Sequence, residues 1–236
     1  MDYILKRKKL LVIAPHPDDE AFGCAGLISK VKNLGGKVYV VVVSLGDLKQ
    51  YHRSRIIKGS VRRNEFINCM RYLKVDDYDI LFQDEARHLR LDVLPRRDLI
   101  FLLEKEGKLS MDRIKPDIIA LPPVSYNQDH EAVFKAGYTA CRPHLRDLKH
   151  FQRLVLIYDD PTLSWGYERE KFQPNFYVDI SAYLKKKIKA LSFYKSQLKH
   201  PFHQHSIENM THLAKIRGRE IAVDAAEAFV ACRMVV

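Results

Sequence analysis

An uninterrupted apolar run, residues 10–14, leads directly into the segment Pro15-His16-Pro17-Asp18-Asp19-Glu20. An apolar segment of this length without polar alternation is typical of a parallel β-strand that is buried on both faces. The two prolines stiffen the segment that follows, because they hold the backbone extended and disfavour an immediate helix. The sequence therefore predicts an α/β fold in which one histidine and three carboxylates lie at the carboxyl end of a buried strand.

The charged side chains after this strand favour a bound cation. Three consecutive carboxylates repel one another unless a cation lies among them, and the neighbouring imidazole adds a neutral nitrogen ligand. We therefore predict His16 and Asp19 as ligands of a divalent metal, with Asp18 beside the open coordination position, where it can accept a proton from water. The alternative is that the acids only stabilise the start of the next helix, for which a single acidic residue suffices.

Further apolar runs alternate with helical patterns along the rest of the chain. Strands are expected at residues 37–43, 79–82, 118–121, 155–158 and 176–179, and helices at 20–34, 61–73 and 95–113. This alternation predicts βαβ units with right-handed crossovers. The expected architecture is a single Rossmann-like α/β domain over residues 1–236, with a mostly parallel sheet flanked by helices. Residues 44–60 are expected to form a loop over the carboxyl edge of the sheet, where such folds bind their ligands.

The first motif resembles that of the PIG-L/LmbE-like zinc-dependent N-deacetylases, Ala-His-Pro-Asp-Asp-Glu, with Pro15 in place of the usual alanine. The resemblance implies hydrolysis of an N-acetyl group on an amino sugar with Zn²⁺, although Fe²⁺ or another divalent metal also suits such ligands. It also implies that Arg62, three residues before Glu65, and Asp84, after the third strand, bind the sugar. Arg62 has a second interpretation, a helix residue that pairs with a neighbouring acid.

A second apolar strand, residues 118–121, also ends in prolines and leads into Asn127-Gln128-Asp129-His130 at the start of a helix. The carboxyl ends of parallel strands can meet at one edge, and the family resemblance implies a second motif here, so we predict that His130 joins His16 and Asp19 as the third ligand. The alternative is a structural histidine at the start of a helix. Two histidines and one carboxylate leave a position open for water, as catalytic zinc requires. Asp129 either orients a ligand imidazole or caps the helix.

Asn127 stands where many relatives carry a histidine to which the family assigns a role on the oxyanion or the leaving amine. Its amide can donate a hydrogen bond to an oxyanion, but it cannot release a proton. Our preferred mechanism therefore uses Asp18 as both base and acid. His200, His203 and His205 form a further cluster, which we interpret as solvated histidines of a flexible loop, with one of them as an alternative acid. Trp165 is a candidate for stacking on a sugar ring, against the more common role of tryptophan in a core or interface.

The formal net charge of +11 is expected to concentrate anionic ligands near the protein. Nucleic acid is not a predicted partner, because the basic runs lack interleaved aromatic residues and no helix-turn-helix or zinc-finger spacing occurs. The expected partner is an N-acetyl amino-sugar substrate. An anionic group on that substrate, peripheral contact with an acidic membrane surface and a homo-oligomer are left open. The four cysteines lack metal-binding or disulfide spacing and no signal-peptide core is recognisable, so we expect a cytoplasmic location.

The sequence thus predicts a metal-dependent N-deacetylase, a hydrolase of linear amide C–N bonds. One alternative is an amidase that acts on a thiol-sugar or another N-acyl conjugate, since the same site can perform that reaction. Another is a catalytically silent module that binds carbohydrates or anions, for which Asn127 is the supporting residue. An iron oxygenase also uses two histidines and one carboxylate, but a base beside the water favours hydrolysis.

Overall fold

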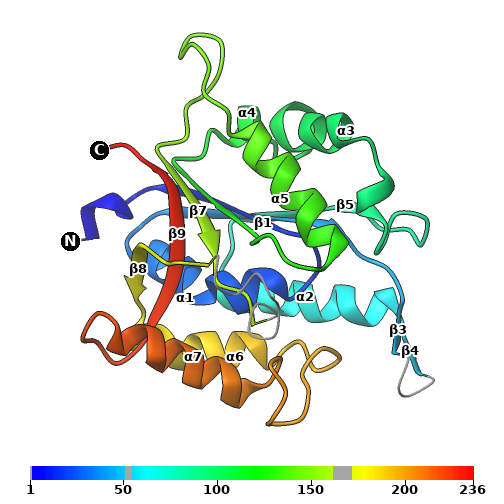
Figure 1. Cartoon of the computed structure of the whole chain (residues 1–236), viewed down its shortest axis with the longest axis vertical. Helices are drawn as coiled ribbons and strands as arrows, with labels where there is room; N and C mark the ends of the chain where they lie inside the picture. Colours follow the sequence, from blue (N-terminus) through cyan, green and yellow to red (C-terminus); the bar gives the residue numbers. More distant parts are fainter. Residues whose placement is uncertain (1, 51–54, 162–171) are drawn as a thin grey trace.

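The apolar runs pair into one seven-stranded sheet in the order β5-β2-β1-β6-β7-β9-β8 (Figure 1). The computed structural model describes residues 2–50, 55–161 and 172–236. The strands are β1 (Lys9–Ala14), β2 (Lys37–Ser44), β5 (Asp77–Phe82), β6 (Ile118–Leu121), β7 (Leu154–Tyr158), β8 (Phe176–Asp179) and β9 (Ala226–Met234). Neighbours from β5 to β7 are parallel, whereas β9 is antiparallel to β7 and β8. The predicted α/β class with a mostly parallel sheet is confirmed.

Helices cover both faces of this sheet (Figure 1). One layer contains α1 (Asp19–Asn33), α2 (Gly59–Leu73), α6 (Leu184–Leu191) and α7 (Ile207–Arg219). The other contains α3 (Arg96–Phe101), α4 (Met111–Ile114) and α5 (Gln128–Ala140). Among the helices in the described part of the chain, none combines the length and the apolarity needed to cross a bilayer. Two helical layers explain why the central strands are apolar on both faces.

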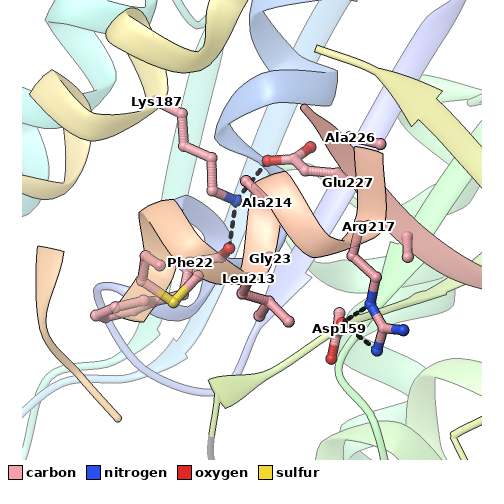
Figure 2. Close-up of a pocket in the computed structure, with 11 residues that line it drawn as sticks. Phe22, Gly23, Asp159, Lys187, Leu213, Ala214, Arg217, Ala226 and Glu227 are labelled. Carbon is pink, nitrogen blue, oxygen red and sulfur yellow. Dashed lines mark hydrogen bonds and ion pairs between the residues drawn. The ribbon is translucent and has the colours of Figure 1, made fainter. Parts of the chain in front are cut away.

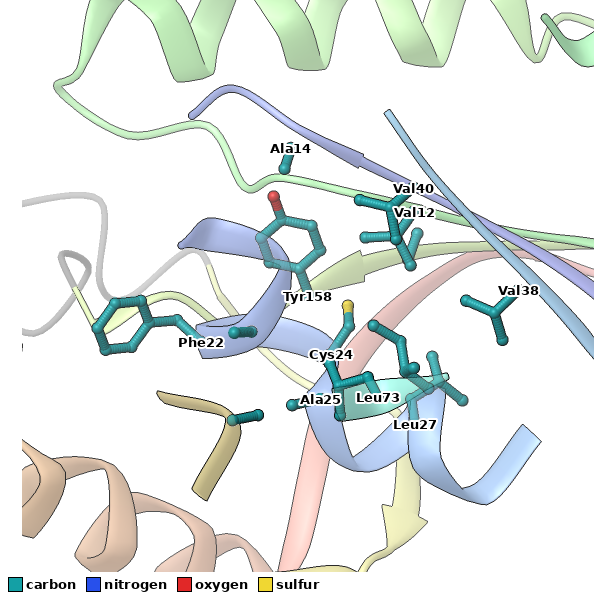
Figure 3. Close-up of a cluster of buried hydrophobic side chains, with 14 of the residues drawn as sticks. Val12, Ala14, Phe22, Cys24, Ala25, Leu27, Val38, Val40, Leu73 and Tyr158 are labelled. Carbon is teal, nitrogen blue, oxygen red and sulfur yellow. The ribbon is translucent and has the colours of Figure 1, made fainter. Parts of the chain in front are cut away.

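The residues of β1 alternate between the two layers. Leu10, Val12 and Ala14 pack into the apolar cluster on the α1 side, part of which Figure 3 shows. Leu11 and Ile13 pack into a second cluster on the α5 side. All five side chains are at most 1% exposed, as expected for a strand buried on both faces.

The position of β1 in the sheet places its carboxyl end beside that of β6. Leu10 lies opposite Val38 of β2 on one side and opposite Ile118 of β6 on the other, and both pairings are parallel. The chain therefore leaves β1 and β6 in the same direction, at the same edge of the sheet. This adjacency brings together two segments that are more than a hundred residues apart.

The single helix expected at residues 95–113 is wrong. The segment forms α3, a short π-helix (Leu102–Glu106) and then, after a turn, α4. The N–H of Gly107 donates a hydrogen bond to the carbonyl of Leu102, which ends the first helical stretch. Helical periodicity persists across such a break, so the apolar pattern alone does not reveal it.

The expected loop at residues 44–60 also contains regular structure. Two short strands, β3 (Leu48–Gln50) and β4 (Arg55–Ile57), pair in antiparallel register, and residues 51–54 between them lie outside the described part of the chain. Their pairing gives the backbone polar groups hydrogen-bond partners that a loop would take from water.

A buried ion pair holds α1 against α6 and β9. Lys187 of α6 is 2% exposed and donates hydrogen bonds of 2.6 Å to Glu227 Oε1 and to the Phe22 carbonyl (Figure 2). Glu227 of β9 also accepts hydrogen bonds from the backbone N–H groups of Gly26 and Leu27, at 2.8 and 2.7 Å. Because α1 begins with the acidic residues that follow β1, this connection fixes the helix that presents them.

Lys187→Met is expected to lower the free energy of unfolding by about 3–5 kcal/mol, because the Glu227 carboxylate would stay buried without its counter-charge. Urea denaturation followed by circular dichroism measures this change. Lys185→Met, at an exposed position of the same helix, is the matched control and should change the free energy by no more than about 0.5 kcal/mol. Equal stability of the two variants would show that the buried pair is dispensable.

Candidate metal centre

Three side chains meet at the carboxyl edge of the sheet, beyond β1 and β6. His16 follows β1, Asp19 begins α1, and His130 lies in the first turn of α5. Asp19 Oδ2 lies 3.7 Å from His16 Nδ1 and 3.5 Å from His130 Nε2. One ligand atom of each residue lies within 4.8 Å of the other two, and all three residues are buried. The structure thus brings together the two segments that the sequence analysis paired.

Carboxylates also lie against the outer nitrogens of both imidazoles. Asp129 Oδ2 lies 2.9 Å from His16 Nε2. Asp160 Oδ2 lies 3.6 Å from His130 Nδ1, an ion-pair distance longer than a hydrogen bond. Each histidine therefore turns one nitrogen to an acid and the other toward Asp19. In metal sites such carboxylate–histidine pairs fix the tautomer and the orientation of the ring, so this donor set fits Zn²⁺ or Fe²⁺.

The acidic residues of this cluster favour a positive charge among them. Burial raises the pKa of Asp18 well above its ordinary value, and the charge of Asp19 raises it further. Burial and then the charge of Asp160 raise the pKa of Asp19 in the same way. A bound cation removes this penalty because it attracts the ionised carboxylates. Burial lowers the pKa of His16 to about 4, so its imidazole is neutral at physiological pH, the form that binds metals.

Asp129 and Asn127 have different roles at the start of α5. The carboxylate of Asp129 contacts His16 and also accepts a hydrogen bond of 2.9 Å from the Leu91 N–H. The helix is capped by Asn127, whose Oδ1 accepts a hydrogen bond of 2.9 Å from the Asp129 N–H. Of the two interpretations of Asp129, the contact with the imidazole is the one that the structure forms. Capping uses only the oxygen of the Asn127 amide and leaves its NH₂ group as a donor.

Arg62 of α2 is 4% exposed, and its side chain extends toward the loop after β2. Its Nη1 donates to the Gly46 carbonyl at 3.2 Å and lies 2.9 Å from His88 Nε2. Its Nε is buried without a hydrogen-bond partner among the described residues. Glu65, three residues along α2, instead accepts hydrogen bonds of 2.8 and 2.6 Å from the N–H and hydroxyl of Ser196. A buried, incompletely satisfied guanidinium is a feature of a ligand site more than of a surface ion pair.

Asp84 is held in a turn beyond β5. Its Oδ1 accepts a hydrogen bond of 3.1 Å from the Arg87 N–H, and its Oδ2 forms an ion pair of 3.0 Å with Arg87 Nε. These contacts stabilise the turn and do not include His16, Asp19 or His130. The role of Asp84 in sugar binding therefore stays a prediction.

His88 and Asp160 were missed by the sequence analysis. His88 is 4% exposed and lies edge-on to His16, with ring centroids 5.5 Å apart. Because its Nε2 faces the Arg62 donor, its Nδ1 carries the proton and donates to Ser44 Oγ at 3.2 Å. Burial lowers the pKa of His88 to about 3, which keeps the ring neutral. The only signal for His88 in the sequence is its position shortly after a predicted strand.

The histidines of residues 200–205 differ in their exposure. His200 and His203 are exposed, as expected. The expectation that all three are solvated is wrong for His205, which is half-buried with its ring centroid 5.2 Å from that of Phe22. Burial lowers the pKa of His205 to about 4. Trp165, the candidate for stacking on a sugar, lies outside the described residues.

A family model described as GlcNAc-PI de-N-acetylase (PIG-L) matches residues 11–141, which is more than half of the 236-residue chain and includes both motifs. The chain belongs to the PIG-L family. Within the family it resembles a probable N-acetyl-alpha-D-glucosaminyl L-malate deacetylase 2 of Bacillus subtilis (strain 168), with 29% identity over 143 residues. That match covers 56% of this chain and 62% of the Bacillus protein, so the chain spans less than two thirds of that relative.

Solved structures with the PIG-L fold include proteins with different activities. The N,N'-diacetylchitobiose deacetylase from Pyrococcus horikoshii has a TM-score of 0.71 and 22% identity, with 98% of this chain and 86% of that chain covered. The 4-carboxy-2-hydroxymuconate hydratase from Pseudomonas putida KT2440 has a TM-score of 0.75 and 18% identity, with coverages of 97% and 98%. At these identities the likeness shows the fold alone, so the choice of reaction depends on the site residues.

Proposed function

We propose that this PIG-L family member hydrolyses the N-acetyl group of an N-acetylated amino sugar, either free, nucleotide-linked or in a glycolipid. The products are acetate and the free amine. The observation that carries the proposal is the buried cluster of His16, Asp19 and His130 with Asp18 adjacent in the chain. The printed description of the family model and the name of the Bacillus relative, both deacetylases of N-acetylglucosaminyl compounds, support the substrate class.

A divalent ion, for which we propose Zn²⁺, is held by His16, Asp19 and His130 in this mechanism. When bound, such an ion supplies a Lewis acid that polarises a carbonyl and makes water a stronger nucleophile at neutral pH. Asp129 keeps the ring of His16 in the orientation that turns Nδ1 inward, through the 2.9 Å contact with Nε2. Asp160 lies on the corresponding side of His130.

The proton transfers are assigned to Asp18. Its carboxylate accepts a proton from the water that attacks the acetamide carbonyl, and a C–O bond forms. The same group then returns the proton to the amine nitrogen as the C–N bond breaks, so acetate and the amine leave. The NH₂ group of Asn127 is a donor for the oxyanion of the tetrahedral intermediate. This arrangement needs no separate acid in place of the histidine that many relatives carry.

Substrate binding is assigned to Arg62, with Asp84 as a further candidate. The guanidinium of Arg62 is buried, and its Nε lacks a hydrogen-bond partner among the described residues; a hydroxyl or an anionic group of the substrate would supply one. Burial lowers the pKa of Arg62, and the charges of Asp18 and Asp19 oppose this shift, which supports a role for this cation together with these carboxylates. A single domain over residues 1–236, a cytoplasmic location, membrane contact and a homo-oligomer stay predictions.

Acetate release tests the proposed function. We expect the metal-reconstituted protein to release acetate and free amine in equal amounts from at least one of three substrate groups: N-acetylhexosamines that are free, nucleotide-linked or lipid-linked. Treatment with a chelator should abolish the release, and Zn²⁺ should restore it. Without a cation, the negative charges of the carboxylates in the His16, Asp19 and His130 cluster are not compensated. Other N-acyl conjugates in the same panel identify a broader amidase. A protein that binds Zn²⁺ and these sugars but releases no acetate is a binding module.

A further inference from the structure

Asp18 has a backbone conformation that residues with a side chain rarely adopt. Its φ is 123° and its ψ is −33°, and it directly precedes the first residue of α1. A residue persists in such a conformation only where the surrounding structure holds it there, and such residues are concentrated at active sites. The direction of the Asp18 side chain therefore depends on the groups that hold its backbone.

Glu20 provides the side-chain contact to this strained residue. Its Oε2 accepts a hydrogen bond of 3.1 Å from the N–H of Asp18. On the other side, the carbonyl of Asp18 accepts hydrogen bonds of 2.9 Å from the N–H groups of Ala21 and Phe22, as part of the start of the helix. Glu20 itself is 0% exposed, so its carboxylate depends on protein partners to satisfy its oxygens.

Tyr194 provides the partner for the second oxygen of Glu20. Its hydroxyl donates a hydrogen bond to Glu20 Oε1, and its ring is 0% exposed within the apolar cluster on the α1 side. Tyr194 follows α6 and is 174 residues from Glu20 in the sequence. Two residues later, Ser196 binds Glu65 of α2 through its N–H and hydroxyl. The segment after α6 is therefore attached both to the first motif and to the helix that carries Arg62.

We propose that Glu20 and Tyr194 are positioning residues that hold Asp18 in its strained conformation and thereby direct its carboxylate toward the reacting atoms. The inference rests on the proposed function, which assigns the proton transfers to Asp18. Glu20 touches the backbone of Asp18, and Tyr194 contacts Glu20. Neither residue is a ligand in the candidate metal cluster, so their loss should impair catalysis more than metal binding.

Tyr194→Phe removes only the hydroxyl and tests the proposal in the metal-loaded full chain. Tyr158→Phe is the matched control, because Tyr158 is also 0% exposed in the same cluster and its hydroxyl donates at 3.3 Å to the Ile13 carbonyl. We expect Tyr194→Phe to lower kcat about 10- to 100-fold, the range that a small misplacement of a catalytic group causes. KM and the Zn²⁺ affinity, measured by competition with a chromogenic chelator, should change less than about threefold, and Tyr158→Phe should leave kcat within about twofold.

A double-mutant cycle separates positioning from a general structural role. If Tyr194 acts through Asp18, Tyr194→Phe should have no further effect on kcat in an Asp18→Asn background. Glu20→Gln keeps an acceptor for the Asp18 N–H and should retain more activity than Glu20→Ala. Equal kcat for wild type and Tyr194→Phe, or equal losses for Tyr194→Phe and Tyr158→Phe, would overturn the proposal.

Amide hydrogen exchange of ¹⁵N-labelled protein tests the same inference without an activity assay. Tyr194→Phe should accelerate exchange at the Asp18 amide at least about tenfold, because the acceptor of that amide has lost its own support, whereas Tyr158→Phe should not. Unchanged protection of the Asp18 amide contradicts the positioning role even if the wild type proves inactive on acetylated sugars. Inactivity of the wild type with the expected exchange pattern contradicts the proposed function alone.

Discussion

Asp18→Asn is expected to lower kcat for acetate release about 100- to 10,000-fold while the protein keeps its metal, because the amide cannot accept the proton of the attacking water. Asparagine is the informative substitution, since it has the same shape and tolerates a positive φ better than most residues do. The measurement combines initial rates with the metal content of the purified variant. The result expected for a proton acceptor is a low kcat with one bound Zn²⁺ per chain, as in the wild type.

Asp92→Asn is the control for Asp18→Asn. Asp92 is exposed in the short helix Leu91–Val93. The first residue of this helix, Leu91, donates its N–H to Asp129, so Asp92 lies close to the site in the fold without a contact to His16, Asp19 or His130. Its variant should have the wild-type kcat and metal content. If Asp18→Asn instead loses Zn²⁺ in proportion to its activity, Asp18 is a metal ligand and another group accepts the proton.

Asp129→Ala is expected to weaken Zn²⁺ binding about 10- to 100-fold, because residues that orient a ligand imidazole typically contribute this much to metal affinity. In the structure the Asp129 carboxylate joins His16 Nε2 to the Leu91 N–H, so its removal leaves both the ring and this N–H without that partner. Titration of the metal-free protein against a chelator of known affinity measures the change. Activity at saturating Zn²⁺ should recover much of the wild-type rate.

Asp84→Ala is the matched control for metal affinity. Its carboxylate contacts Arg87 and not the histidine cluster, so the variant should bind Zn²⁺ as tightly as the wild type. If Asp84 binds the sugar, as the family resemblance implies, this variant changes KM instead. Unaltered Zn²⁺ affinity in Asp129→Ala would mean that other contacts set the orientation of His16. One such contact is the hydrogen bond of 2.9 Å that the backbone N–H of His16 donates to Asp19 Oδ2.

The sequence by itself determined the architecture and the meeting of the two motifs. An apolar run at residues 10–14 requires cover on both faces, and helical patterns between such runs supply it, so an α/β sheet follows from burial alone. Parallel strands deliver their following loops to one edge, so His130 is expected at the same edge as His16 and Asp19; the pairing of β1 with β6 then brings these residues together. These inferences succeed because they depend on periodicity and chain direction, which are local properties of the sequence.

Only the tertiary structure decided which groups support these residues. Asp160, His88 and Tyr194 come from distant segments, and no spacing in the sequence announces that they face His130, Arg62 and Glu20. Such contacts depend on how helices and loops pack around the sheet, and a shift of one helical turn would replace every partner. The strained backbone of Asp18 belongs to the same class, because its combination of a φ of 123° and a ψ of −33° is rare for a residue with a side chain and persists where the surrounding structure holds it.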